Sequence, residues 1–182
     1  MVRTKKRTLT AIAAAALLCM LAALVCFFMP AGKTAYAAET TVSSEEALNS
    51  AIASASEGAI IKLGGNISAS DSVTIPSGKN ITIDLNDFKI SCESSYAIAN
   101  EGTLTLENGT IEGGSRGISS TSSAAKTYLV DCAVSGTTYG VYLSGKGHLE
   151  AENSTISGGK YGLYVYGSTA EIVGGKIGRA HV

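Results

Sequence analysis

Apolar and polar residues alternate in short runs between residues 58 and 176, and turns rich in Gly, Asn and Ser separate the runs. In the phrase LTLENGTIEGG, Leu104 and Leu106 fall on one side of an extended chain, while Thr105 and Glu107 fall on the other. The phrases YLVDCAVSG and LEAENSTISGG repeat this alternation, and little helical periodicity interrupts it. The pattern predicts many short β-strands joined by turns.

The strands recur with a period of about 22 residues. A β-branched residue marks each period, at intervals of 23, 21, 23, 22 and 21 residues: Ile67, Ile90, Ile111, Val134, Ile156 and Ile177. A second phrase lies between these positions, in YAIAN, RGISS, YGVYLSG and YGLYVYG. Leucine-rich repeats need a denser Leu framework, and the β-branched, Gly-rich composition excludes helical repeats. The sequence therefore predicts a parallel β-solenoid, in which equivalent residues of successive coils stack ~4.8 Å apart.

The phrase ENSTISGGKYGLYVYGS, residues 152–168, resembles the right-handed parallel β-helix repeat of the pectate-lyase-like superfamily. The resemblance covers roughly residues 58–175 and implies a right-handed coil with three sheets. It leaves the activity open, because lyases, glycoside hydrolases, epimerases, adhesins and phage tailspikes share this repeat.

Residues 38–57 are expected to cap the first coil with a short helix. Ser43 and Glu46 have the spacing of a capping box, and Leu48 and Ile52 fall on one helical face. No comparable segment follows the coils of residues 58–176, which we therefore interpret as a truncated solenoid. The peptide KIGRAHV back-translates to a sequencing adapter, so residues 177–182 are interpreted as a non-native, adapter-derived tail.

Residues 1–37 have the pattern of a bacterial secretory signal: a basic start, an apolar run over residues 11–28, and small residues at Ala35 and Ala37. We expect cleavage after Ala37, no stable membrane span thereafter, and a secreted or cell-surface protein. The alternative is a retained membrane anchor. From residue 38 onward, nine Lys and Arg face 15 Asp and Glu, giving a net charge of −6 that makes nucleic acid an unsuitable partner. Cys92 and Cys132 fall in different columns about two coils apart, so we expect both to be free thiols.

Four tyrosines are the candidate glycan site. Tyr142 and Tyr164 should stack on an outer face, with Tyr139 and Tyr161 at the adjacent bend. Exposed aromatic rings can bind the faces of sugars. The alternative is that these rings only stabilise the sheet.

Acidic residues provide a second candidate site. Glu107, Asp131 and Glu152 are expected in or near one outward column, where carboxylates could bind Ca²⁺, as in the calcium-dependent lyases of the superfamily. The alternative is a solvated acidic face without any cofactor. Asn108 and Asn153 are interpreted as turn residues of a column that Cys132 and Gly174 interrupt.

No residue is assigned a catalytic role. His148 beside Glu150 could form an acid/base pair or simply face solvent, and the motifs of pectin hydrolases and pectate lyases do not occur. The first functional hypothesis is a bacterial adhesin-like or glycan-binding scaffold without catalytic activity. The alternatives are a lyase or hydrolase of pectin-like uronans, with its active site on missing coils, and a purely structural stalk.

Overall fold

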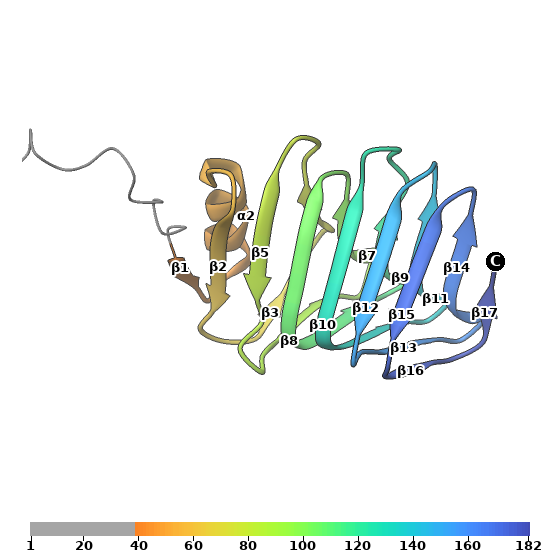
Figure 1. Cartoon of the computed structure of the whole chain (residues 1–182). Helices are drawn as coiled ribbons and strands as arrows, with labels where there is room; N and C mark the ends of the chain where they lie inside the picture. Colours follow the sequence, from red (N-terminus) through yellow and green to blue (C-terminus); the bar gives the residue numbers. More distant parts are fainter. Residues whose placement is uncertain (1–38) are drawn as a thin grey trace, which may run out of the picture. The chain divides into compact units, whose positions relative to one another are not determined.

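The computed structural model describes residues 39–182, so the predicted signal and its cleavage after Ala37 lie outside the described residues. Each full coil crosses three faces, and every strand pair is parallel (Figure 1). The first face contains β1 (Glu39–Val42), β2 (Ala59–Leu63), β5 (Asn80–Asp84), β8 (Thr103–Gly113), β10 (Lys126–Gly136), β12 (His148–Glu152) and β15 (Thr169–Val173).

The other two faces complete each coil. The second face contains β3 (Ile67–Ser68), β6 (Lys89–Cys92), the second halves of β8 and β10, β13 (Thr155–Gly158) and β16 (Lys176–Ile177). The third face contains β4 (Val73–Ile75), β7 (Tyr96–Asn100), β9 (Arg116–Ser120), β11 (Tyr139–Ser144), β14 (Tyr161–Tyr166) and β17 (Ala180–His181). Because β8 and β10 bend from the first face onto the second, these two faces form one continuous sheet.

The strand register confirms the predicted repeat. Ile90 pairs with Ile67 in the preceding coil and with Ile111 in the following one. Val134 pairs with Ile111 and Ile156, and Ile156 pairs with Ile177. All six marker residues therefore stand in one column, as the spacing of the β-branched residues predicts.

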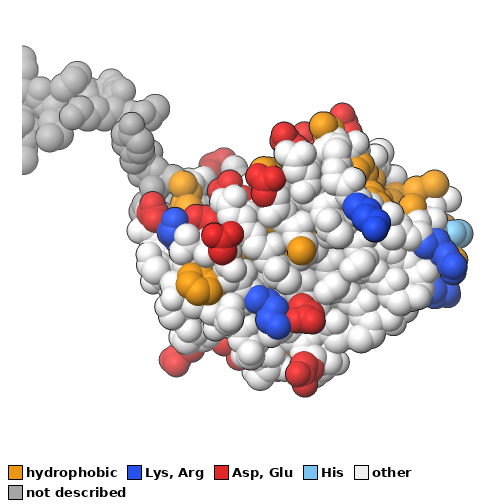
Figure 2. Space-filling model, turned by 90° about the horizontal axis from the view of Figure 1, so that it is seen from below, with side chains coloured by type: hydrophobic (Ala, Val, Ile, Leu, Met, Phe, Trp, Pro, Cys, Tyr) orange, Lys and Arg blue, Asp and Glu red, His pale blue; other side chains and the backbone are white. Residues whose placement is uncertain are grey.

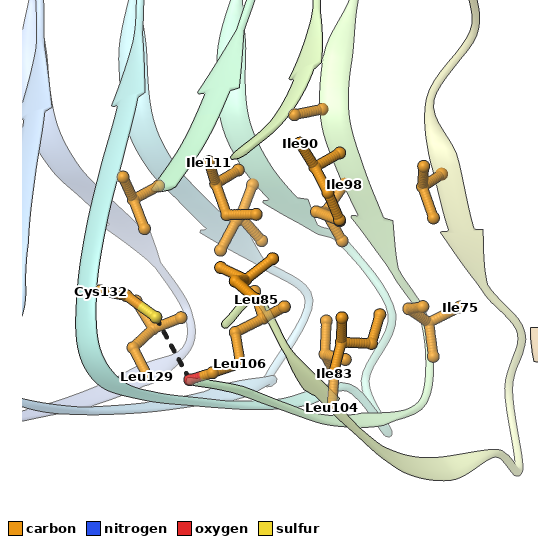
Figure 3. Close-up of a cluster of buried hydrophobic side chains, with 14 of the residues drawn as sticks. Ile75, Ile83, Leu85, Ile90, Ile98, Leu104, Leu106, Ile111, Leu129 and Cys132 are labelled. Atoms are coloured by element: carbon orange, nitrogen blue, oxygen red, sulfur yellow. Dashed lines mark hydrogen bonds between the residues drawn. The ribbon is translucent and has the colours of Figure 1, made fainter. Parts of the chain in front are cut away.

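The interior is filled by columns of aliphatic side chains (Figure 3). Leu104 and Leu106 of β8 are fully buried, as are Ile90 and Ile111. Burial of each such side chain contributes ~1.5–3 kcal/mol to stability. Cys92 and Cys132 are both free and buried, as predicted. Burial raises the pKa of Cys132 to about 11, and its Sγ donates to the carbonyl oxygen of Leu106 at 3.3 Å.

The interior also contains a small polar network that the sequence pattern did not predict. Asn100 Nδ2 donates to Thr127 Oγ1 at 2.9 Å, and the Thr127 hydroxyl lies 3.2 Å from Ser120 Oγ. Asn100 Oδ1 accepts from the backbone N–H of Gly102. Every member of the network is hydrogen-bonded, so the burial of these polar groups is compensated.

The helix α2 (Glu45–Ser54) lies at the end of the solenoid where β1 begins (Figure 1). Leu48 and Ile52 are buried against the coils, as predicted. The predicted capping box is wrong: Ser44 is the N-cap, and its Oγ accepts from the N–H of Ala47 at 3.2 Å. Three residues after Ser44 stands Ala47 rather than an acid. Within residues 39–182, no helix is long and apolar enough to cross a membrane.

Residues 177–182 continue the stack. Ile177 pairs with Ile156, and His181 of β17 pairs with Tyr164 of β14. The predicted adapter origin of these residues stays a prediction.

Candidate functional site

Four tyrosines of β11 and β14 form two stacked pairs on the outer side of the third face. Tyr142 and Tyr164 are register partners whose ring centroids lie 5.0 Å apart with 3° between the ring planes. Tyr139 and Tyr161, also partners, lie 6.3 Å apart with 15° between the planes. The predicted stacking is confirmed. We call these four residues the tyrosine ladder.

The two pairs of the ladder also touch each other. The ring of Tyr139 meets Tyr142 and Tyr164 edge-on, with centroid distances of 5.3 and 5.5 Å. All four side chains are partly exposed. The contacts hold each ring between neighbours, so the ladder is a rigid array on a rigid sheet.

The local sequence places the rings on the outer side. Val141 and Leu143 point into the core, and the alternation of a strand directs Tyr142 outward. Gly140, the second residue of β11, allows the backbone of neighbouring segments to approach closely. A Cβ at Gly140 would lie 2.5 Å from the carbonyl oxygen of Ser157 and 2.7 Å from that of Gly162, so only glycine fits there without backbone movement.

Arg116 is a fifth member of the patch that the sequence analysis missed. It occupies the position equivalent to Tyr139, and its other register partner is Tyr96. Its guanidinium carbon lies 3.7 Å from the ring centroid of Tyr142 and 4.8 Å from that of Tyr96. Nη1 also donates to Ser119 Oγ at 2.9 Å. The matching phrases RGISS and YGVYLSG align Arg116 with Tyr139, and this alignment could have revealed it.

The ring faces of the ladder are covered rather than open. Arg116 covers one face of Tyr142, and Tyr164 covers the other. The second face of Tyr164 meets His181, with centroids 5.0 Å apart and 12° between the planes. Neighbouring side chains therefore cover both faces of Tyr142 and Tyr164, and glycan contact by these rings stays a prediction. Because strand side chains stand roughly perpendicular to the sheet, the hydroxyl end of each of these partly exposed rings points away from it.

Tyr166 adds one open ring to this surface. It follows Tyr164 by two positions on β14, so both side chains leave the same side of the strand. Tyr166 is 70% exposed, and within residues 39–182 it joins no ring pair. Tyr166 is therefore the most exposed ring of this surface.

The register places Glu107 and Glu152 in one column, as predicted, with Asp131 beside it, and the calcium role stays a prediction. Glu107 and Glu152 both pair with Val130, so a valine separates them and they lie two coils apart, ~9.6 Å along the axis. Asp131 follows Val130 at a turn and has a φ of 52°, like Asn108 and Asn153 with φ of 58° and 48°. Asp131, not Cys132, therefore belongs to the Asn108 column. No group of three His, Cys, Asp or Glu in residues 39–182 is placed to hold a metal ion.

One acidic residue of the first face, Asp84, is held by an ion pair and two hydrogen bonds. Asp84 forms an ion pair of 3.0 Å with Lys62 and accepts hydrogen bonds from Asn108 Nδ2 and the N–H of Asn86. Burial opposes the ionisation of Asp84 and is the largest single effect, but these donors together lower its pKa. The hydrogen bond to Asp84 in turn raises the pKa of Lys62.

The predicted His148 and Glu150 pair gains no support as an acid/base pair. His148 Nδ1 lies 2.8 Å from Thr169 Oγ1, and Glu150 has Tyr128 and Glu171 as its register partners. A separate depression of about 410 Å³ lies over β6 and β8, between Lys89, Ser91 and Glu112. Lys89 and Glu112 form a 2.7 Å ion pair across it, and Glu93 also lines it.

The stacked parallel coils define the protein as a β-solenoid, and a comparison with protein families identifies which kind of β-solenoid it is. Residues 41–177 match the family described as the right handed beta helix region, and the chain belongs to this family. The membership confirms the expected right-handed coil and is consistent with the resemblance to the pectate-lyase-like superfamily. No curated protein and no solved structure matches the chain.

Proposed function

We propose that the protein is an exported β-helix scaffold that binds glycans through the tyrosine ladder and Tyr166, without catalysing a reaction. The observation that carries this proposal is the fixed row of Tyr142 and Tyr164, in register on successive coils and partly exposed. A glycan chain lying along the solenoid axis would meet equivalent tyrosine hydroxyl groups at two successive coils.

The rigidity of the ladder favours binding. Side chains that are ordered before a ligand arrives lose little conformational entropy when it binds. Tyrosine also supplies a large contact area and a hydroxyl that donates and accepts hydrogen bonds, as sugar hydroxyls require. Tyr166 supplies an accessible ring at the edge of the same surface.

The covered ring faces of Tyr142 and Tyr164 also favour a second function, a structural stalk. In a stalk, the rings would stabilise the stack and contact no ligand. The two functions differ in the role of the tyrosine hydroxyl groups. Glycan binding uses them as hydrogen-bond donors and acceptors, whereas stacking in a stalk needs only the rings.

Screening the purified protein against immobilised neutral and acidic glycans tests the proposal, followed by titration of each glycan that binds. The double variant Tyr142→Phe with Tyr164→Phe keeps both rings and removes both hydroxyls. We expect it to weaken binding about tenfold or more, since each lost hydrogen bond costs ~0.5–1.5 kcal/mol. Tyr166→Ala should also weaken binding.

Tyr128→Phe is the matched control, because Tyr128 is a partly exposed tyrosine on the first face. It should leave the affinity unchanged. Absence of binding to every glycan, or equal affinity of the double variant and the wild type, would contradict the proposal and favour the stalk.

A further inference from the structure

We infer that Arg116 makes the tyrosine surface selective for anionic glycans, by binding a carboxylate or sulfate group on a sugar. The inference rests on the proposed function and names its ligand class. Two observations support it: Arg116 lies among the tyrosine rings, and its own positive charge has no carboxylate partner within residues 39–182.

Arg116 has no carboxylate partner in the described part of the chain. The ion pairs there join Lys62 to Asp84 and Lys89 to Glu112. Rings cover the guanidinium instead, at 3.7 Å for Tyr142, 4.8 Å for Tyr96 and 5.7 Å for Tyr139. Aromatic faces attract a cation but do not neutralise it.

Most hydrogen-bond donors of Arg116 are also unused. A guanidinium has five N–H donors, and within residues 39–182 the side chain donates to Ser119 Oγ alone. The side chain is partly exposed, so the other donors can reach a ligand. Two parallel N–H groups of arginine match the two oxygens of a carboxylate or sulfate.

The surrounding rings fix the guanidinium before any ligand arrives. Arginine stacks its plane on aromatic faces, and Ser119 holds one end of that plane. Ser119 is itself buried, 5% exposed, and therefore a fixed acceptor. An anionic group on the sugar would thus bind Arg116 while the sugar hydroxyls contact the neighbouring Tyr142 and Tyr164.

The charge distribution along the solenoid favours an anion at this place. Residues 39–112 contain three Lys and Arg against 11 Asp and Glu, whereas residues 113–176 contain five against four. In Figure 2, the acidic side chains lie mostly toward the end where the described chain begins, whereas Lys and Arg are spread along this face and lie without acidic neighbours at the other end. The coils that carry the ladder are therefore those that repel an anionic glycan least.

The test compares three oligosaccharides of equal length: an oligouronate, a sulfated oligosaccharide and a neutral oligosaccharide. We expect the wild type to bind at least one acidic probe at least tenfold more tightly than the neutral one. The two acidic arms show whether carboxylate or sulfate is the preferred group. Added salt should reduce the affinity for the acidic probe and leave the neutral probe unaffected.

Two variants assign this preference to Arg116. Arg116→Gln should abolish the preference for acidic probes, and Arg116→Lys should restore only part of it, because lysine keeps the charge and loses the two-pronged geometry. Lys126→Gln is the control, an exposed cation at the start of β10. Thermal melting of each variant shows that the fold is kept.

The outcomes separate the inference from the proposed function. Acidic preference that is unchanged in Arg116→Gln, or equal binding of neutral and acidic probes by the wild type, overturns the inference alone. No binding of any probe overturns both. Loss of the preference in Arg116→Gln, with neutral binding retained, supports both.

Discussion

The rings of Tyr142 and Tyr164 stack with their centroids 5.0 Å apart and their planes 3° apart, although 22 residues separate them along the chain. The contact exists because each strand of the third face pairs with the equivalent strand of the next coil. A stack of this kind contributes to stability whether or not a ligand binds.

Tyr142→Ala should therefore lower the free energy of unfolding by ~2 kcal/mol. The variant loses the stack on Tyr164, the edge contact with Tyr139 and the cation–π contact with Arg116, worth ~0.5–1.5 kcal/mol for each ring pair and ~0.5–1 kcal/mol for the cation. Urea unfolding measures the change. Tyr142→Phe, which keeps the rings in contact, should stay within ~0.5 kcal/mol of the wild type.

Ile156→Asp should abolish folding. Ile156 is fully buried between Val134 and Ile177, and an aspartate there would place an unpaired charge inside the coil. Circular dichroism and limited proteolysis measure the loss. Ser157→Asp, on the next and exposed position of the same strand, is the control and should fold. A folded Ile156→Asp would show that the inward side of β13 is assigned wrongly.

The ion pair of Asp84 and Lys62 should make stability depend on pH in a defined direction. The pKa of Asp84 is lowered in the folded state, so its contribution is complete above the unfolded pKa of ~4 and is lost as the pH falls through the folded value. The pKa of Lys62 is raised, so its contribution is lost only as the pH rises through a folded value above ~10.4.

Asp84→Asn should consequently unfold at lower urea than the wild type at pH 7, and the two midpoints should converge below about pH 4. Glu46→Gln, which changes an exposed carboxylate of α2, should show no such dependence. A constant difference between Asp84→Asn and the wild type from pH 7 down to pH 3 would show that the ionisation of Asp84 does not stabilise the fold.

The contributions of Ser43 and Ser44 to stability should differ, because Ser44 alone is the N-cap of α2. Ser44→Ala should cost ~1 kcal/mol, because it removes the acceptor of the Ala47 N–H. Ser43→Ala should cost much less, since Ser43 precedes the cap. Thermal unfolding of both variants measures the difference, and a larger effect at Ser43 would restore the capping box predicted from the sequence.

The fold was predictable because two periodicities coincide. Leu104 and Leu106 show the two-residue alternation of a strand, and Ile90 and Ile111 show the return of the chain after one coil. Each strand must bury its apolar side, and only one strand register satisfies both the two-residue alternation and the repeat of about 22 residues. For the same reason, the matching segments YGVYLSG and YGLYVYG were enough to predict that Tyr142 stacks on Tyr164.

The features that were missed depend on individual residues that depart from the repeat. Arg116 stands in a column between Tyr96 and Tyr139, and the aromatic pattern alone does not indicate a cation there. The charge of Asp131 suggests a place beside Glu107, whereas its position is set by a left-handed backbone conformation that Asn, Asp and Gly tolerate best. Thr127 lies among buried leucines because Asn100 and Ser120 satisfy its hydroxyl, a contact that no periodicity reveals.

The most direct test of the stacked coils is a disulfide between register partners. Ser135 and Ser157 pair across β10 and β13, and both lie on the outer side. The double variant Ser135→Cys with Ser157→Cys should form this disulfide under mild oxidation, because directly paired residues fall within the Cα separation that a disulfide needs. Peptide mapping by mass spectrometry identifies the bond. Ser135→Cys with Thr155→Cys, shifted by two residues, should form little of it, and preferential crosslinking of this shifted pair would contradict the register of the solenoid.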